Sequence, residues 1–172
     1  MTFFVAQIIG VVTIPIEIAS MQFKNMKYIL TAQCLSNFLI VVQYALLGGL
    51  SGAAVCIVAT VQTLTLYIYR KKEKPFPTVL TGVFLFAYLL SSIVIFQTAN
   101  DILSCAAAIL FGISVAQTQS AKYRVFILVN SILWIIYDIN TAAYTMIITH
   151  GIAVVSVIVG MMRLDTPKRS IG

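Results

Sequence analysis

Seven long apolar runs dominate this chain and leave it few possible folds. They cover residues 3–22, 28–47, 50–69, 78–97, 102–117, 123–139 and 142–162. A helix needs about 20 mostly apolar residues to cross a bilayer. The runs are apolar around the whole circumference of a helix, and they lack the period-two alternation of membrane barrel strands. We therefore predict an all-α integral membrane protein with seven transmembrane helices.

Composition supports this prediction. Of the 172 residues, 60% are hydrophobic and 9% are charged, whereas soluble domains carry about 25% charged residues. Mean hydropathy is +1.01. A soluble helical bundle with a very apolar core is the weaker alternative, because its helices would need polar stripes. The first run has no basic segment before it and no clear cleavage site after it, so we interpret it as a retained span and not as a signal peptide.

The basic residues predict an orientation. All of them follow the first, third, fifth or seventh run: Lys24, Lys27, Arg70, Lys71, Lys72, Lys74, Lys122, Arg124, Arg163, Lys168 and Arg169. Basic residues near span ends stay in the cytoplasm, so we predict an outside N-terminus and a cytoplasmic C-terminus. The net charge of +6 is then a signal of topology, and we expect no nucleic-acid partner. The segment RKKEKPFP is a cytoplasmic loop that could also touch anionic lipid head groups.

The two ends of the chain resemble each other. The dipeptide Lys-Tyr at 27–28 recurs 95 residues later at 122–123, and other matches at offsets of 95 or 93 are Gln22 with Gln117, Asn37 with Asn130, Tyr44 with Tyr137, Val61 with Val154 and Arg70 with Arg163. We predict a first three-helix bundle in residues 1–72, a linker helix in 73–99, and a second three-helix bundle with a short tail in 100–172. Parallel repeats of this kind occur in transporters that bind substrate between the halves.

This 3-1-3 plan resembles the SWEET sugar facilitators and the wider PQ-loop superfamily. Four segments more closely resemble YgjV-type bacterial inner-membrane proteins: AQIIG (6–10), QYALLGGLSGAA (43–54), ILWIIYDI (132–139) and TMIITHG (145–151). The resemblance implies a multi-pass protein of the bacterial cytoplasmic membrane that moves a small polar solute, such as a sugar, by alternating access. The PQ dipeptide is absent, and Leu110 stands near the place where the second half would match Pro15. A symmetric proline hinge is therefore in doubt.

Two residues of the first run have possible functional roles. An ionisable residue within a span is costly and usually faces the bundle interior or a water-filled cavity. Glu17 is either a neutral structural residue bonded to a neighbouring helix, a residue that reaches the inner interface, or a proton-coupling site. Pro15 removes one helix hydrogen bond, so it predicts a local kink and, as a further hypothesis, a gating hinge.

A substrate pocket is hypothesised from residues of the second, sixth and seventh runs. Asn37 and Tyr44 share one helix face, and their repeat mates Asn130 and Tyr137 share another with Trp134. The asparagines either join helices or contact a ligand. Trp134 is either an interfacial anchor or a flat surface on which a solute stacks. The SWEET resemblance implies a pocket tryptophan on span six, at Trp134.

The same resemblance implies an asparagine on span seven, where this chain has His150. This histidine is either a satisfied interior residue or a contact for substrate or protons. Asp138 either caps the last span and contacts outside water or lines the outer mouth of the pathway.

Other classes of function lack their motifs. The sequence contains no Walker loop, nucleophile elbow, HExxH or paired carboxylates, so we expect no enzyme, cofactor or metal. Cys34, Cys56 and Cys105 lie singly in apolar runs and predict packing without a disulfide. As partners we expect the bilayer and a small-molecule substrate, with further copies of the chain as an additional candidate. The alternative function is a non-transporting membrane protein such as a sensor, receptor or assembly partner, which would have a dry and tightly packed interface between its halves.

Overall fold

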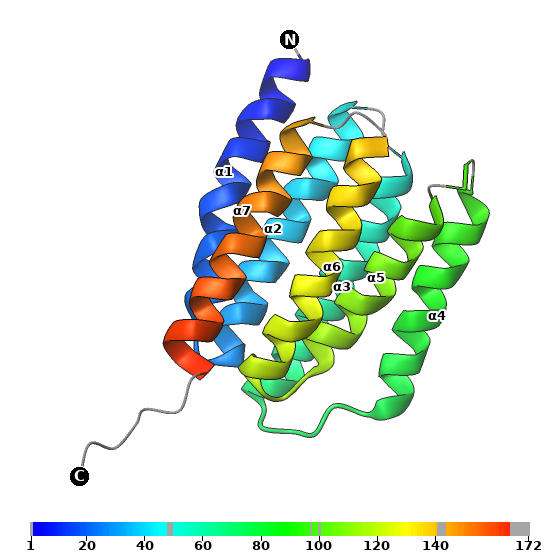
Figure 1. Cartoon of the computed structure of the whole chain (residues 1–172). Helices are drawn as coiled ribbons and strands as arrows, with labels where there is room; N and C mark the ends of the chain where they lie inside the picture. Colours follow the sequence, from blue (N-terminus) through cyan, green and yellow to red (C-terminus); the bar gives the residue numbers. More distant parts are fainter. Residues whose placement is uncertain (1, 48–49, 97, 100, 141–143, 166–172) are drawn as a thin grey trace.

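The computed structural model describes residues 2–47, 50–96, 98–99, 101–140 and 144–165. These form seven α-helices and a final turn of π-helix (Figure 1): α1 (Thr2–Gln22), α2 (Met26–Leu47), α3 (Leu50–Lys71), α4 (Thr78–Val94), α5 (Asp101–Ala116), α6 (Ser120–Asn140), α7 (Tyr144–Gly160) and η1 (Met161–Asp165). The described part contains no strand. The all-helical prediction is confirmed, and each apolar run corresponds to one helix.

Five of the helices, namely α1, α2, α3, α6 and α7, are long and apolar enough to cross a membrane. The apolar helices α4 and α5 have 17 and 16 residues. At about 1.5 Å per residue they are about 25 Å long, against a hydrocarbon core of about 30 Å. Length therefore supports five of the seven predicted crossings, while full crossings by α4 and α5 remain a prediction.

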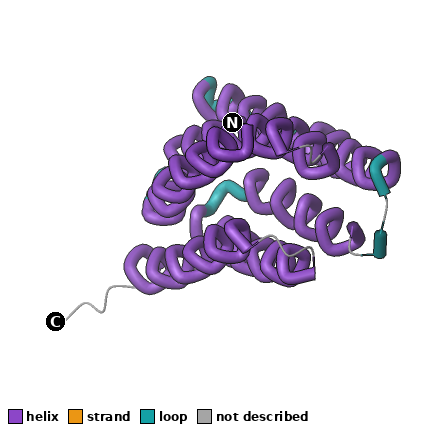
Figure 2. Tube along the Cα trace, turned by 90° about the horizontal axis from the view of Figure 1, so that it is seen from above, coloured by secondary structure: helices purple, strands orange, loops and turns teal. Residues whose placement is uncertain are grey.

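The helices pack in chain order around a common centre. Each helix contacts the next one along the chain, α7 contacts α1, and α3 also contacts α5. Seen from above, the N-terminal helices form one curved row and the C-terminal helices lie opposite it (Figure 2). The two rows meet at α1 and α7 on one side, and at α3, α4 and α5 on the other.

Short connections place the ends of the odd-numbered helices together. The loop after α1 is brief because Asn25 caps α2, with its Oδ1 accepting the Lys27 N–H at 2.9 Å. Residues 72–77 and 117–119 are the equivalent connections after α3 and α5. Because successive helices run antiparallel, these connections lie at the end of the bundle where the chain terminates, at the bottom of Figure 1. We call this the basic end, since the described Lys and Arg residues occur there or in the adjacent helix turns.

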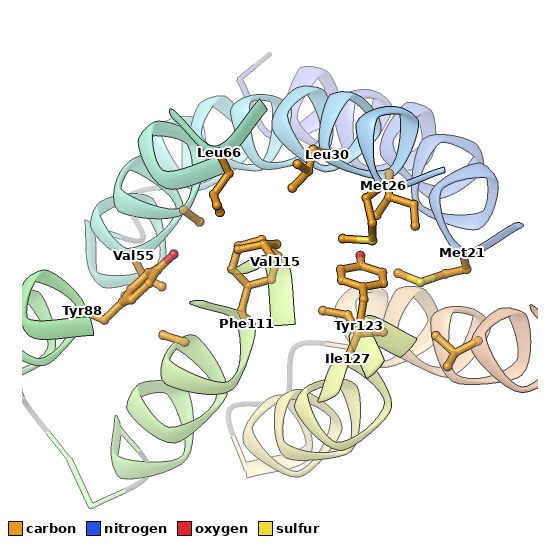
Figure 3. Close-up of a cluster of buried hydrophobic side chains, with 14 residues drawn as sticks. Met21, Met26, Leu30, Val55, Leu66, Tyr88, Phe111, Val115, Tyr123 and Ile127 are labelled. Carbon is orange, nitrogen blue, oxygen red and sulfur yellow. The ribbon is translucent and has the colours of Figure 1, made fainter. Parts of the chain in front are cut away.

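The outer surface is apolar and the interior holds much of the polarity. Large hydrophobic side chains are widely exposed, among them Phe4 (73%), Val79 (78%) and Val94 (74%). Exposed apolar surface on this scale is costly in water and suits contact with lipid. The exposed side chains therefore argue against the alternative of a soluble helical bundle. Inside, Figure 3 shows side chains from both rows, including Leu66, Phe111 and Tyr123, pointing toward the centre.

A central polar cavity as candidate functional site

A cavity of about 80 Å³ lies among the helices, and all seven contribute to its wall. A cavity of this size has room for several water molecules or one small solute. The wall consists of Gly10, Thr13, Glu17 and Met21 of α1; Gln33, Asn37, Ile40, Gln43 and Tyr44 of α2; Val55, Cys56 and Ala59 of α3; Tyr88 of α4; Ala108 and Phe111 of α5; Ile127, Asn130, Ser131 and Trp134 of α6; and Met146, Thr149, His150 and Ala153 of α7.

The wall of the cavity follows helical periodicity. On α1 the lining residues are spaced three or four apart, from Gly10 to Met21, so they form one stripe about 16 Å long. Gly10 is needed where the stripe meets α2, because a Cβ there would lie 2.7 Å from Nε2 of Gln43. The glycine leaves room for that amide in the cavity wall.

Glu17 is held between α1 and α2 by a small polar network. The Ser36 hydroxyl donates to Oε1 of Glu17 at 3.0 Å. The neighbouring Ser20 hydroxyl donates to the Glu17 carbonyl at 2.7 Å and accepts from Nε2 of Gln33 at 2.9 Å. The carboxyl group therefore has a fixed position at the cavity wall, where it interacts electrostatically with His150 of α7.

Two amide groups in the wall are buried without a hydrogen-bond partner among the described residues. Asn37 is 8% exposed and its Nδ2 has no acceptor; Gln43 is 1% exposed and its Oε1 has no donor. A buried polar atom left unpaired costs about 1–3 kcal/mol. Both groups lie in the cavity wall, so a polar guest in the cavity can supply the missing bonds.

Trp134 forms part of the wall on the opposite row. Its ring lies parallel to that of His150, with centroids 5.8 Å apart and an interplanar angle of 9°. Tyr137 packs edge-on against it at 5.4 Å and 88°. The cavity thus has an aromatic wall on α6 and α7, facing the carboxyl and amide groups of α1 and α2.

Six of the nine residues singled out from the sequence line this cavity: Glu17, Asn37, Tyr44, Asn130, Trp134 and His150. Tyr137 lies behind Trp134 and does not line the cavity. Pro15 has an exposed side chain on the outside of α1, which continues as one helix through it; its hinge role remains a prediction. The side chain of Asp138 lies outside the described residues.

Sequence reasoning missed several polar residues of the interior. Gln33 and Gln43 belong to the same face of α2 as Asn37 and Tyr44, so spacing within an apolar run was an available signal. Tyr88 had no such signal. Its hydroxyl donates to Oε1 of Gln62 at 2.9 Å, and Nε2 of Gln62 donates to the Gly112 carbonyl at 3.0 Å. The linker helix α4 is thereby joined to α3 and α5 and contributes to the cavity.

Arg124 differs from the other basic residues because it is fully buried. Its Nε donates to the Met21 carbonyl at 3.0 Å and its Nη2 to the Phe23 carbonyl at 2.6 Å. Its Nη1 pairs with Oδ1 of Asp165 at 2.7 Å. Arg124 thus lies at the basic end like the other basic residues, but its side chain is buried there and joins α6 to the end of α1 and to η1.

Two other arginines connect the rows at the basic end. Arg70 of α3 donates from Nη2 to the carbonyls of Gln117 and, at 3.5 Å, of Ala116. Arg163, just after α7, donates from Nη1 to Oε1 of Gln22 at 3.4 Å. One arginine thus ties α3 to the end of α5, and the other ties the end of α7 to α1.

The described part of the chain includes free thiols but no cluster of metal-ligating side chains. No group of three or more His, Cys, Asp or Glu side chains gathers there. Cys34, Cys56 and Cys105 are free thiols, and Cys56 lies in the cavity wall.

Comparison with known proteins gives one match. A family model described as bacterial inner membrane protein matches residues 4–168, which is nearly the whole chain. The curated proteins and the solved structures yield no match.

Proposed function

The chain belongs to the Imp-YgjV family of bacterial inner membrane proteins, and from this premise we propose that it transports a small polar solute by alternating access around the central cavity. It is a multi-pass protein of the inner membrane, with helices long and apolar enough to span it. The observation that carries the proposal is the cavity itself, which lies inside the bundle and has a largely apolar wall with a few polar groups, among them buried amide atoms without partners.

The cost of these polar groups favours a ligand site over a purely structural interior. A bundle selected only to pack would fill its centre with apolar side chains, because polar groups within a membrane are expensive. Here Asn37 and Gln43 each leave a polar atom unpaired. A scaffold or sensor with a dry interface gains nothing from that arrangement, whereas a solute site does.

The contacts at the basic end support the proposed pair of three-helix bundles. Arg70 and Arg163 are repeat mates, and so are their acceptors Gln117 and Gln22. Arg70 contacts the backbone of Gln117, while Arg163 contacts the side chain of Gln22. Both contacts nevertheless join a third helix of one half to a first helix of the other. A pair of contacts of this kind supports the proposal that the halves are parallel repeats related by a two-fold axis along the membrane normal.

These contacts also suggest how access could alternate. Both arginine contacts lie at the basic end. The contact between Arg163 and Gln22 is exposed, so water can replace it, whereas the contacts of Arg70 are partly buried. Breaking them, together with the bonds from Arg124 to the Met21 and Phe23 carbonyls, would let the two halves part at the basic end, which we place in the cytoplasm by the distribution of Lys and Arg. The solute would then enter or leave the cavity from that side while the other end stays closed.

The test is to identify a solute and then measure its movement. Purified protein is screened by thermal shift against sugars, amino acids, vitamins and organic acids, because a ligand of the folded state raises its apparent stability. Compounds that stabilise it are then assayed for uptake into proteoliposomes. We expect uptake that is lost in Trp134→Ala and retained in Phe38→Ala, whose side chain is 56% exposed on the outside of α2.

Two results would count against transport. If no compound stabilises the protein at millimolar concentration, the sensor or assembly-partner function becomes the better account. If a compound stabilises the protein but does not enter proteoliposomes, the cavity is a binding site without transport.

A further inference from the structure

Glu17 is the only carboxyl group among the described residues that line the cavity, and no lysine or arginine lines it with Glu17. Two of the remaining described acids lie away from the cavity, Glu73 in the loop before α4 and Asp101 at the start of α5. Asp165 is paired with Arg124. The cavity wall thus contains an acid without a permanently charged partner.

An isolated carboxylate is unstable in such a place. Removing its charge from water costs several kcal/mol unless a counter-ion compensates. The single hydrogen bond from Ser36 does not replace a full hydration shell. Glu17 therefore either keeps its proton or lies beside a cation.

Few groups of the protein can supply that cation. The titratable groups around Glu17 are Tyr44 on α2, Cys56 on α3, Tyr88 on α4, Tyr123 on α6 and His150 on α7. His150 is the one basic side chain among them, and its ring is stacked on Trp134.

We propose that Glu17 makes the cavity an exchange site, in which the protonated amine of a small solute takes the place of the Glu17 proton. The proposal rests on the cavity being a solute site, as argued above. On binding, the carboxyl O–H bond breaks, the proton leaves to water, and a carboxylate–ammonium pair forms. One positive charge enters and one leaves, so the net charge of the cavity is unchanged.

The remaining wall suits such a solute. The unpartnered Oε1 of Gln43 can accept a hydrogen bond from a hydroxyl or N–H group elsewhere on the solute. The unpartnered Nδ2 of Asn37 can donate to a hydroxyl or carbonyl oxygen elsewhere on the solute. A neutral solute would bind without releasing a proton. An anion would meet Glu17 with no fixed cation to hold it.

The experiment compares matched compounds that differ in charge. The amines are cyclohexylamine, ethanolamine and butylamine; the alcohols are cyclohexanol, ethylene glycol and 1-butanol; the acids are cyclohexanecarboxylate, glycolate and butyrate. Amines and carboxylates keep their charges between about pH 6 and 8.5. Binding to the purified full chain is followed by thermal shift, and proton release is followed with a pH indicator in weakly buffered solution.

We expect at least one amine to bind and its matched alcohol and acid to bind more weakly or not at all. Binding should release about one proton per amine, and apparent affinity should rise up to about tenfold per pH unit while the empty site is protonated. Glu17→Gln should abolish both proton release and pH dependence, and His150→Gln should retain them. In Ser36→Ala, which keeps the carboxyl group, release should persist with an altered pH profile.

Three outcomes would overturn the exchange site: binding confined to alcohols or acids, amine binding without proton release, or release that is lost in His150→Gln and kept in Glu17→Gln. Absence of amine binding at millimolar concentration would also overturn it. Transport is judged separately by proteoliposome uptake. Amine binding with proton release but no uptake would retain the exchange site and reject transport. Uptake of neutral solutes alone would support transport and reject the exchange site.

Discussion

Asn37 and Asn130 occupy matched places in the two halves, and both are buried in the cavity wall. Their hydrogen bonding differs. Nδ2 of Asn130 donates to the Ala107 carbonyl of α5 at 2.5 Å, whereas Nδ2 of Asn37 has no acceptor among the described residues. Asn130 thus joins two helices, and Asn37 keeps a donor for the cavity. The sequence offered both roles for both residues; the structure shows the helix-joining role for Asn130, and ligand contact by Asn37 remains a proposal.

This difference predicts opposite effects on stability. Asn37→Leu removes an unpaired buried donor, which costs about 1–3 kcal/mol, so the protein should be as stable as wild type or more stable. Asn130→Leu removes a hydrogen bond worth about 1 kcal/mol and should be less stable. Thermal unfolding in detergent measures both variants, each serving as the other's control. A lower midpoint for Asn37→Leu would show that its amide has a structural partner.

Arg124 connects three elements at the basic end, namely α6, the end of α1 and η1. The elements approach closely there. A Cβ at Gly160 would lie 2.6 Å from the Met21 carbonyl and 3.1 Å from Nε of Arg124. Backbone cannot yield as a flexible side chain would, so a small residue is required at this crossing of α7 and α1. The guanidinium then fills the remaining space and satisfies the last carbonyls of α1.

Loss of this arginine should destabilise the bundle. Arg124→Gln leaves Asp165 without its partner and two carbonyls without donors, and breaking a buried ion pair from one side costs about 3 kcal/mol. Lys122→Gln changes the same charge two residues away on an exposed side chain and should be nearly neutral. The unfolding midpoints of the two variants test this. Equal midpoints would mean that the buried arginine contributes no more than a surface charge.

Sequence reasoning found the elements more readily than their contacts. Apolar runs predicted every helix, because backbone polar groups in lipid must bond within the helix. Polar breaks in those runs pointed to Glu17 and Asn37. The rotation of one helix against another is not visible in a run that is apolar on all sides. For that reason the sequence did not show that Arg124 is buried and Lys122 exposed, or that Tyr44 lines the cavity and Tyr137 does not. The place of Tyr88 depends on its bond to Gln62 of another helix, which no pattern within α4 reveals.

At the scale of the whole molecule, the basic end sets the orientation. We predict that this end is cytoplasmic and the N-terminus is outside. The test places single cysteines, in a chain whose native cysteines are replaced by alanine, at two exposed positions: Glu73 in the loop after α3 and Thr98 between α4 and α5. An impermeant maleimide should label Thr98→Cys in intact spheroplasts and Glu73→Cys only in inverted vesicles. Labelling of both from one side would mean that α4 does not cross the membrane.

The central claim is that the cavity opens alternately to the two sides, and Cys56 in its wall reports this without knowledge of the solute. With Cys34 and Cys105 replaced by alanine, an impermeant cationic methanethiosulfonate is applied to right-side-out and to inverted vesicles. Alternating access predicts labelling of Cys56 from both sides, with faster labelling from the cytoplasm when Arg70 and Arg163 are changed to glutamine. Labelling from one side only, or from neither, would contradict the account.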